Sequence, residues 1–391
     1  MAVDKFFQFT IGPVQGFVSQ ARRTRDFWAG SFLLSWLSGV AMAEVKRQSG
    51  EINFPVPPSG YLDWITGDGK GQAPRQGAIP NRFKAYQFKV PENFDSKLVI
   101  QCVREAWFLL AEHVWQRDEL GRCAGLRLHT TRSIWERQNR DFWDISWVLS
   151  DDDGDASLMD QRKNWRAHYG QPEPGVKCMM MDGWQELSGA ERPGQAGEAF
   201  WRDVRQGKET DIGPKEQLCA LAYVKRRFAR HFESFSATLG SGLKVQGWAL
   251  ETGMPSVSYM AAVHWLEQVV QQATPDQARQ LLDAARGVSR SQDEWDTRIP
   301  CLQAAAGRWA SDNDKRRLLS LDASVFFEHV QNNPQANDLD KQAILELQRE
   351  VQRLRQSHVT VDAHPSPFYA ILLMDGDSLG SHMGNKDNQR P

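Results

Sequence analysis

The pattern of apolar and polar positions at the start of the chain predicts a strand, a long helix and a second strand. Lys5–Ile11 alternates weakly and runs into Gly12-Pro13, which predicts a strand that ends in a turn. From Val14 to Lys46 the apolar residues recur at helical spacing, so we predict one long helix there. Glu51–Val56 then predicts a short strand.

The next part of the pattern completes a β-α-β-β-α-β order. Arg82–Val90 alternates with one slip of phase, which predicts a strand with a bulge near Ala85. An amphipathic helix over Asn93–Trp115 and a strand over Phe142–Leu149 follow, and Tyr61–Pro80 is typical of an exposed loop. This order predicts a ferredoxin-like domain, in which one antiparallel sheet carries both helices on one face.

Beyond residue 150 the pattern changes to helices. The acidic run Asp151–Asp155 is typical of a solvated loop, since a calcium loop needs more oxygen ligands at fixed spacing, and it marks the first boundary. The helices predicted after it are Gln217–Phe235, Ser258–Gln271, Pro275–Arg286, Ala323–Asn332 and Leu339–Ser357. Pro365 and Pro367 end this part, and an apolar strand over Phe368–Met374 begins another. The predicted fold class is α+β, with domains over 1–150, 151–364 and 365–391.

Composition excludes several classes of protein. The 391 residues carry a formal charge of -2, so any binding to nucleic acid must use local patches. The five cysteines include no C-x-x-C pair, which argues against a disulfide framework or a zinc ribbon and indicates a reducing cytoplasm. The most apolar stretch, Phe32–Val45, is too short to span a bilayer, so we expect no membrane partner. No phosphate-binding loop or nucleophile elbow occurs.

The sharpest chemical candidate is the sequence D-G-D directly after the apolar strand. Asp375 and Asp377 can present two carboxylates to a divalent cation, and Gly376 permits a close approach of the backbone. Two-metal nucleotidyl transfer needs a further acidic pair on a neighbouring strand. The same three residues are also a common β-turn sequence, and an aspartate-nucleophile phosphatase would begin in a similar way.

The residues after the D-G-D sequence are candidates for nucleotide binding. Ser378, Leu379 and Gly380 would open a helix, whose N-terminus can face the phosphates of a nucleotide.

Two basic segments are candidates for contacts with RNA or with another subunit. The cations concerned are Arg22, Arg23 and Arg25 in the first segment, and Lys225, Arg226, Arg227 and Arg230 in the second. Arginine and lysine beside aromatic residues on a helix can bind a phosphate backbone. The alternative for each segment is a solvated helix face with local salt bridges.

Several segments together resemble the large subunit of type III-B CRISPR RNA-guided effector complexes. Phe9–Gly39 resembles the start of the first palm domain of that family, and Ile79–Phe88 resembles a later strand of it. Lys215–Phe228 and Met254–Ala261 are similar to signatures in the helical middle of the family. Phe368–Gly380 resembles the first strand and metal turn of the second palm domain.

The resemblance implies a cytoplasmic ribonucleoprotein of antiviral defence. Its partners would be the other effector subunits, a guide RNA, a target RNA and ATP. In the family, target RNA activates the palm pair, which converts ATP into cyclic oligoadenylate with Mg²⁺ or Mn²⁺. Asp375 and Asp377 match the metal turn. The first palm is degenerate, since Thr10-Ile11-Gly12 stands where an active palm carries acids, so its role would be that of a scaffold and a second nucleotide pocket.

Three departures from the family pattern limit what this chain should do. It contains no Gly-Gly dipeptide, so the catalytic G-G-D-D hairpin is missing. It has no room for the HD nuclease domain of many relatives, and its cysteines lack the zinc spacing. We therefore expect an N-terminal part of a longer protein, inactive alone, with a tail that is disordered or weakly docked. The alternatives are a non-catalytic scaffold subunit that binds guide and target RNA, and an unrelated cyclase or phosphatase.

Overall fold

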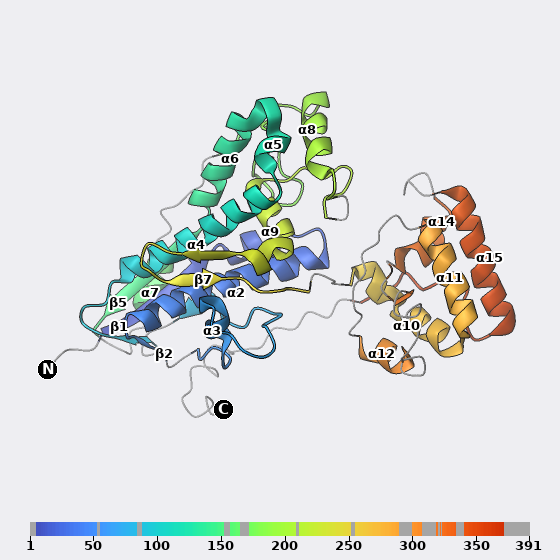
Figure 1. Cartoon of the computed structure of the whole chain (residues 1–391), viewed down its shortest axis with the longest axis horizontal. Helices are drawn as coiled ribbons and strands as arrows, with labels where there is room; N and C mark the ends of the chain where they lie inside the picture. The colour runs from blue at the N-terminus through green and yellow to red at the C-terminus, as the bar shows by residue number, and fades with distance from the viewer. Residues whose placement is uncertain are drawn as a thin grey trace. The chain divides into compact units, whose positions relative to one another are not determined.

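The computed structural model describes residues 5–52, 55–83, 88–151, 157–164, 172–208, 211–251, 255–288, 299–306, 318–319, 321, 323–333 and 340–370. This part of the chain forms two compact units, which adjoin in the sequence between residues 256 and 257 (Figure 1). Helices predominate, and both sheets are small and antiparallel. The expectation of a fold that mixes helices with antiparallel sheet is therefore confirmed.

The main sheet of the first unit is organised around β1 (Lys5–Gly12). β5 (Asp144–Ser150) pairs antiparallel with β1 over its length. On the other side of β1, β3 (Arg82–Phe83) and β4 (Phe88–Val90) both pair antiparallel with it, and β2 (Glu51–Ile52) pairs with β4. The order across the sheet is therefore β5, β1, β3 with β4, and β2. This central position buries the polar side chains of β1 as well as the apolar ones, which explains its weak alternation.

The predicted helix Val14–Lys46 is in fact two helices. α1 (Val14–Val18) ends early, and α2 (Thr24–Arg47) begins after a short break. The carboxylate of Asp26 accepts hydrogen bonds from the backbone nitrogens of Arg22 and Arg23, at 3.1 Å each. This side chain satisfies two donors at a helix start, so it creates a new N-terminus inside the predicted helix.

α4 (Ser96–Arg117) is the second long helix of this unit, and it packs against α2. Asp95 caps it by accepting hydrogen bonds from the backbone nitrogens of Lys97 and Leu98, at 2.9 and 3.3 Å. The predicted loop after residue 60 contains a helix, α3 (Tyr61–Thr66), because Tyr61 and Ile65 are buried against α2.

The first unit continues well beyond residue 150. Its further elements are α5 (Leu120–Ala124), η1 (Gly125–Arg127), α6 (Leu128–Asp141), α7 (Ser157–Asn164), α8 (Gln195–Arg205), α9 (Ala220–His231), η2 (Phe232–Ser234), β6 (Ser236–Thr238) and β7 (Lys244–Gln246). The β6–β7 hairpin was not predicted. Trp201, Phe232 and Trp248 belong to the same core as Phe9 and Trp107, so the compact unit extends past the expected boundary at 150.

The second unit is helical in the part that the structure describes. Its elements are α10 (Val257–Gln272), α11 (Pro275–Val288), α12 (Pro300–Ala306), η4 (Ala323–Phe326), α14 (Glu328–Gln331) and α15 (Lys341–Ser357). α11 and α15 pack side by side, and the predicted stripe on α15 is buried, including Ile344, Leu347 and Val351. The predicted strand Phe368–Met374 is not formed over 368–370, and its remainder lies outside the described residues.

No described helix has the combination of length and apolar composition that crossing a bilayer requires.

Candidate functional site

The structure brings the two predicted basic segments together. The start of α2 faces α9, and acidic residues from two other segments lie between them. We call this cluster the α2–α9 ion network. Its members are Arg23, Arg25, Asp26, Asp118, Asp211, Glu216, Arg226, Arg227, Arg230 and His231.

Arg226 is the most buried cation of the network, with a fully buried side chain. It binds Asp26 in a bidentate manner, from Nε to Oδ1 at 2.6 Å and from Nη2 to Oδ2 at 2.8 Å. Its Nη1 donates to Glu216 Oε2 at 2.8 Å and to the carbonyl oxygen of Asp211 at 2.6 Å. A bidentate arginine–carboxylate pair is strong and geometrically specific, so Arg226 joins α9 to the start of α2.

Arg227 makes the second bidentate pair, with Asp118, the residue directly after α4. Its Nε and Nη2 donate to the two carboxylate oxygens of Asp118, each at 2.8 Å. Asp118 also accepts from Tyr223 Oη at 2.8 Å and lies 2.7 Å from His231 Nε2. Burial tends to raise the pKa of Asp118, but the bonds to Arg227 and His231 outweigh burial and hold the pKa well below its usual value.

Asp211 is shared by three arginines. Its carboxylate pairs with Arg227, with Arg25 at 2.5 Å and with Arg230 at 3.2 Å. Burial tends to raise the pKa of Asp211, and the positive charges of Arg25, Arg230 and Arg227 lower it further than burial raises it. The carboxylate therefore remains charged, and it forms ion pairs with cations of the same chain.

Lys225 ties α9 to the break between α1 and α2. Its Nζ donates to the carbonyl oxygens of Phe17 and Gln20, the latter at 2.7 Å, and lies 5.1 Å from the centre of the Phe17 ring. Burial, together with the charge of Arg226, lowers the pKa of Lys225 to about 8. The side chain of Lys225 is thus part of the packing and is not part of a solvated surface.

This geometry changes the interpretation of the second basic segment. We expected an exposed basic face, but Lys225, Arg226 and Arg227 are only 1%, 3% and 7% exposed. Lys225 donates to backbone carbonyl oxygens, and the carboxylates that neutralise Arg226 and Arg227 come from separate segments of the chain, so local sequence spacing did not reveal these contacts. These three cations are committed to contacts within the chain.

The margin of the network remains accessible. Arg22 is exposed, and the side chains of Arg23 and Arg230 are 36% and 37% exposed, whereas Arg25 is largely buried at 13%. A contact of RNA or a neighbouring subunit with Arg22, Arg23 or Arg230 stays a prediction. The network itself pairs cations with carboxylates and offers no nucleophile beside a free base, so its chemical role is to join helices.

The predicted metal turn lies beyond the part of the chain that the structure describes. Asp375, Gly376, Asp377, Ser378, Leu379 and Gly380 all lie outside the described residues. Within the described residues, no group of three or more His, Cys, Asp or Glu side chains is arranged to hold a metal ion.

Comparison with known proteins finds a family model that matches the N-terminal region. Residues 6–112 match the family model described as "CRISPR-associated protein Cmr2, N-terminal". A solved chain described as "Type III-B Cmr-beta Cryo-EM structure of the Apo state" aligns with 92% of this chain and 43% of its own length, at 14% identity and a TM-score of 0.54. No curated protein matches the chain at a significant level.

A further solved chain, described as "Cryo-EM structure of the Type III-B Cmr-beta bound to cognate target RNA", aligns less well. The alignment covers 58% of this chain and 32% of the other, at 16% identity and a TM-score of 0.34, which is too low to establish a shared fold.

The fold is therefore that of a chain from a type III-B CRISPR effector complex. The match of residues 6–112 to the Cmr2 N-terminal family model, together with this shared fold, supports the resemblance predicted from the sequence. The chain spans less than half the length of the solved chain that it matches.

Proposed function

We propose that this chain forms the N-terminal part of the large subunit of a type III-B CRISPR effector complex, which acts in RNA-guided antiviral defence. One observation carries the proposal: the Cmr2 family match covers residues 6–112, which include most of β1, the strands β2, β3 and β4, the long helix α2 and most of α4. Its partners are the other effector subunits, the guide RNA and the target RNA.

The first unit is, in this proposal, a ferredoxin-like palm domain without catalytic acids. The strand order supports it, since β1 lies between β5 and the β3–β4 pair, and β2 lies at the far edge. Neighbouring strands are antiparallel. Along the chain, the long helix α2 follows β1 and the long helix α4 follows the β3–β4 pair, as the β-α-β-β-α-β pattern requires. The palm would serve as a scaffold.

The activity proposed for the whole protein is the synthesis of cyclic oligoadenylate from ATP. Asp375 and Asp377 would hold Mg²⁺ or Mn²⁺, and their carboxylate oxygens are the ligand type that these ions prefer. A bound metal would stabilise the negative charge that develops on the phosphate during nucleotidyl transfer. Since this chain lacks G-G-D-D, it contributes only the first-strand ligands.

The proposal is tested by assembling the complex. A tagged copy of this chain is expressed together with the other subunits of its effector complex and a guide RNA, and is then purified through the tag. We expect the subunits and the guide RNA to co-purify with it in fixed proportion. Recovery of this chain alone, while the other subunits assemble fully without it, would contradict the proposal.

A purely structural subunit is the second candidate, and the internal neutralisation of the α9 cations favours it. The two candidates differ at the metal turn of the whole protein. The double variant Asp375→Asn with Asp377→Asn should leave assembly of the effector complex unchanged under either candidate function. It should abolish oligoadenylate synthesis only if the catalytic proposal is right, and unaltered synthesis would favour the structural candidate.

A further inference from the structure

A groove with a volume of about 540 Å³ lies along the outer side of α4, away from the ion network. α4 contributes Lys97, Ile100, Gln101, Arg104, Glu105 and Phe108, while α6 contributes Arg140 and β5 contributes Trp147. This volume is within the range of ligand sites, roughly 300–1,000 Å³. The α4 residues recur three or four positions apart, so they form one row along the helix.

The cations of this groove have no carboxylate partner among the described residues. No ion pair or side-chain hydrogen bond joins Lys97, Arg104 or Arg140 to another described residue. Glu105 is the one carboxylate at the groove, and its Oε2 accepts a hydrogen bond from the backbone nitrogen of Gly240 at 2.9 Å. The groove therefore has an excess of positive charge, in contrast to the neutralised cations of α9.

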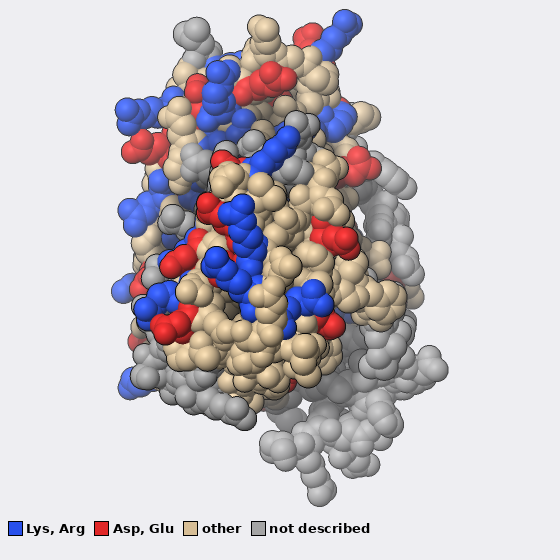
Figure 2. Space-filling view, turned by 90° about the vertical axis from the view of Figure 1, so that its right-hand side faces the viewer, with Lys and Arg blue, Asp and Glu red and all other residues tan. Residues whose placement is uncertain are grey.

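On the face shown in Figure 2, basic and acidic side chains are interspersed over the described residues. Net charge is also close to zero, at -2. A local group of unpaired cations is therefore the kind of feature through which such a chain can attract a polyanion.

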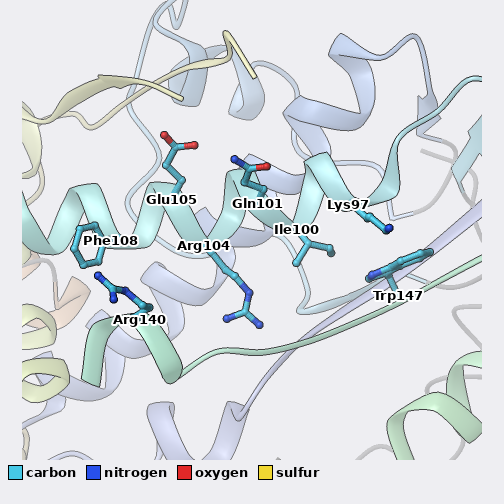
Figure 3. Close-up of a pocket in the computed structure, with 8 residues that line it drawn as sticks. All are labelled: Lys97, Ile100, Gln101, Arg104, Glu105, Phe108, Arg140 and Trp147. Carbon is cyan, nitrogen blue, oxygen red and sulfur yellow. The ribbon is translucent and has the colours of Figure 1, made fainter. Parts of the chain in front are cut away.

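Aromatic rings lie at both ends of the cation row. Figure 3 shows Phe108 beside Arg140 at one end, Trp147 near Lys97 at the other, and Arg104 between them. The guanidinium carbon of Arg140 lies 5.8 Å from the centre of the Phe108 ring, so this ring already holds one cation in place. Trp147 is only partly buried, so part of the indole is accessible from the groove.

We propose that this groove binds single-stranded nucleic acid, with phosphates at Lys97, Arg104 and Arg140 and a base stacked on Trp147. Lys97 and Phe108 lie eleven positions apart on α4, a distance of about 16 Å along the helix. Phosphates of a stacked strand repeat about every 3.4 Å, so several of them can face the row. Cationic grooves with aromatic platforms are typical of binding sites for single strands.

The chemistry of the groove favours this ligand over an acidic peptide. A peptide can neutralise the cations, but its carboxylates carry no flat ring to stack on the half-buried indole of Trp147. A polynucleotide supplies an anion and a π-face at every residue, so it uses both features of the groove. The inference does not depend on the proposed effector function, because it concerns the isolated chain.

The test measures binding of fluorescein-labelled 12-mers, oligouridylate and oligodeoxythymidylate, to the isolated chain at several salt concentrations. Arg104→Ala with Arg140→Ala removes two cations from the groove. The matched control, Lys46→Ala with Arg122→Ala, removes two exposed cations that do not line it. The slope of log K against log salt is negative, and each phosphate contact on a single strand contributes about 0.7 to its magnitude. We therefore expect loss of two contacts in the groove variant to reduce the magnitude of the slope by about 1.4. The control should leave the slope unchanged.

A second variant tests the stacking contact. Trp147→Leu keeps apolar contact with the core but removes the flat ring, and we expect it to weaken binding about tenfold. Circular dichroism of each variant verifies that it is folded. Binding of either oligonucleotide with these losses supports the proposal. Absence of binding, or equal losses in the control variant, would overturn it. So would displacement of the oligonucleotide by polyglutamate together with unchanged oligonucleotide binding by Trp147→Leu, because an acidic peptide would then be the better ligand.

Discussion

Gly30 of α2 and Lys225 of α9 share a space that has no room for another carbon atom. A Cβ at Gly30 would lie 2.9 Å from Lys225 Cε and 3.1 Å from the backbone Cα of Val18. Lys225 cannot move aside freely, because its Nζ is held by the carbonyl oxygens of Phe17 and Gln20. The glycine therefore permits the close approach of the two basic segments.

Gly30→Ala should destabilise the first unit. Alanine favours a helix over glycine by about 1 kcal/mol, but overpacking typically costs about 1–3 kcal/mol, so we expect a net loss. Urea unfolding measures it. Gly287→Ala is the matched control in α11, since its Cβ would meet only Ala343 Cβ at 3.6 Å, and it should be neutral or stabilising. A stabilised Gly30→Ala protein would show that Lys225 is not held as described.

Lys225 should make stability depend on pH in the alkaline range. Its pKa is about 8 in the folded chain and 10.5 in its ordinary state, so between these values the unfolded chain binds more protons. The contribution of Lys225 to the free energy of unfolding should therefore rise as the pH increases from 8 to 10.5. Comparing wild type with Lys225→Met by urea unfolding across this range measures it, and parallel pH curves would refute it.

At the scale of elements, Asp118 is where α4 meets α9. Asp118→Asn removes the charge that Arg227 and His231 share, and leaves Arg227 buried without that partner. Breaking a buried ion pair costs about 3–5 kcal/mol, which we expect as the loss in unfolding free energy. Glu350→Gln, which breaks the exposed pair with Arg353 on α15, should cost at most about 1 kcal/mol. Equal effects would contradict the burial of the network.

The same carboxylates determine the acid limit of stability. The pKa values of Asp118 and Asp211 are lower in the folded chain than their ordinary value of 3.8, and that of Glu216 is lower than 4.5. Their stabilising contribution is complete above those ordinary values and is lost as the pH falls below them.

Helices with a strongly periodic apolar stripe were predictable from the sequence, whereas the contacts between distant segments were not. The α15 stripe of Ile344 and Leu347 is buried as expected. The break before α2 was missed because it depends on the side chain of Asp26, a local hydrogen bond that competes with helix continuation. The β6–β7 hairpin was missed because its strands have three residues each, too few for alternation to show.

The candidate site was predictable only in part. The sequence indicated the arginines near Asp26 and the segment starting at Lys225 as candidates, but it did not indicate that the two segments contact each other. Their meeting depends on Asp118, Asp211 and Glu216, and nothing in the spacing of these acids along the chain links them to the arginines. The groove was not predicted, since Arg140 and Trp147 come near the α4 row of Lys97 and Arg104 only when α4 packs near α6 and β5.

At the scale of the whole molecule, we expect no cyclic oligoadenylate from this chain alone. One acidic pair cannot supply the ligands of two metal ions, which carry most of the charge stabilisation in nucleotidyl transfer. Incubation with ATP and Mg²⁺ or Mn²⁺, followed by mass spectrometry of the products, tests this. Metal-dependent oligoadenylate would show that the chain completes an active palm without G-G-D-D.

The shared carboxylates of the α2–α9 ion network also constrain how related sequences can diverge. Asp211 pairs with three arginines and Asp118 pairs with Arg227 and His231, so loss of either carboxylate alone would leave a buried arginine without one of its partners. Descendants of this chain should therefore inherit the network whole or exchange its members in groups, for example Asp26 together with Arg226. Such joint replacement would appear among relatives as correlated substitution between positions that lie 200 residues apart.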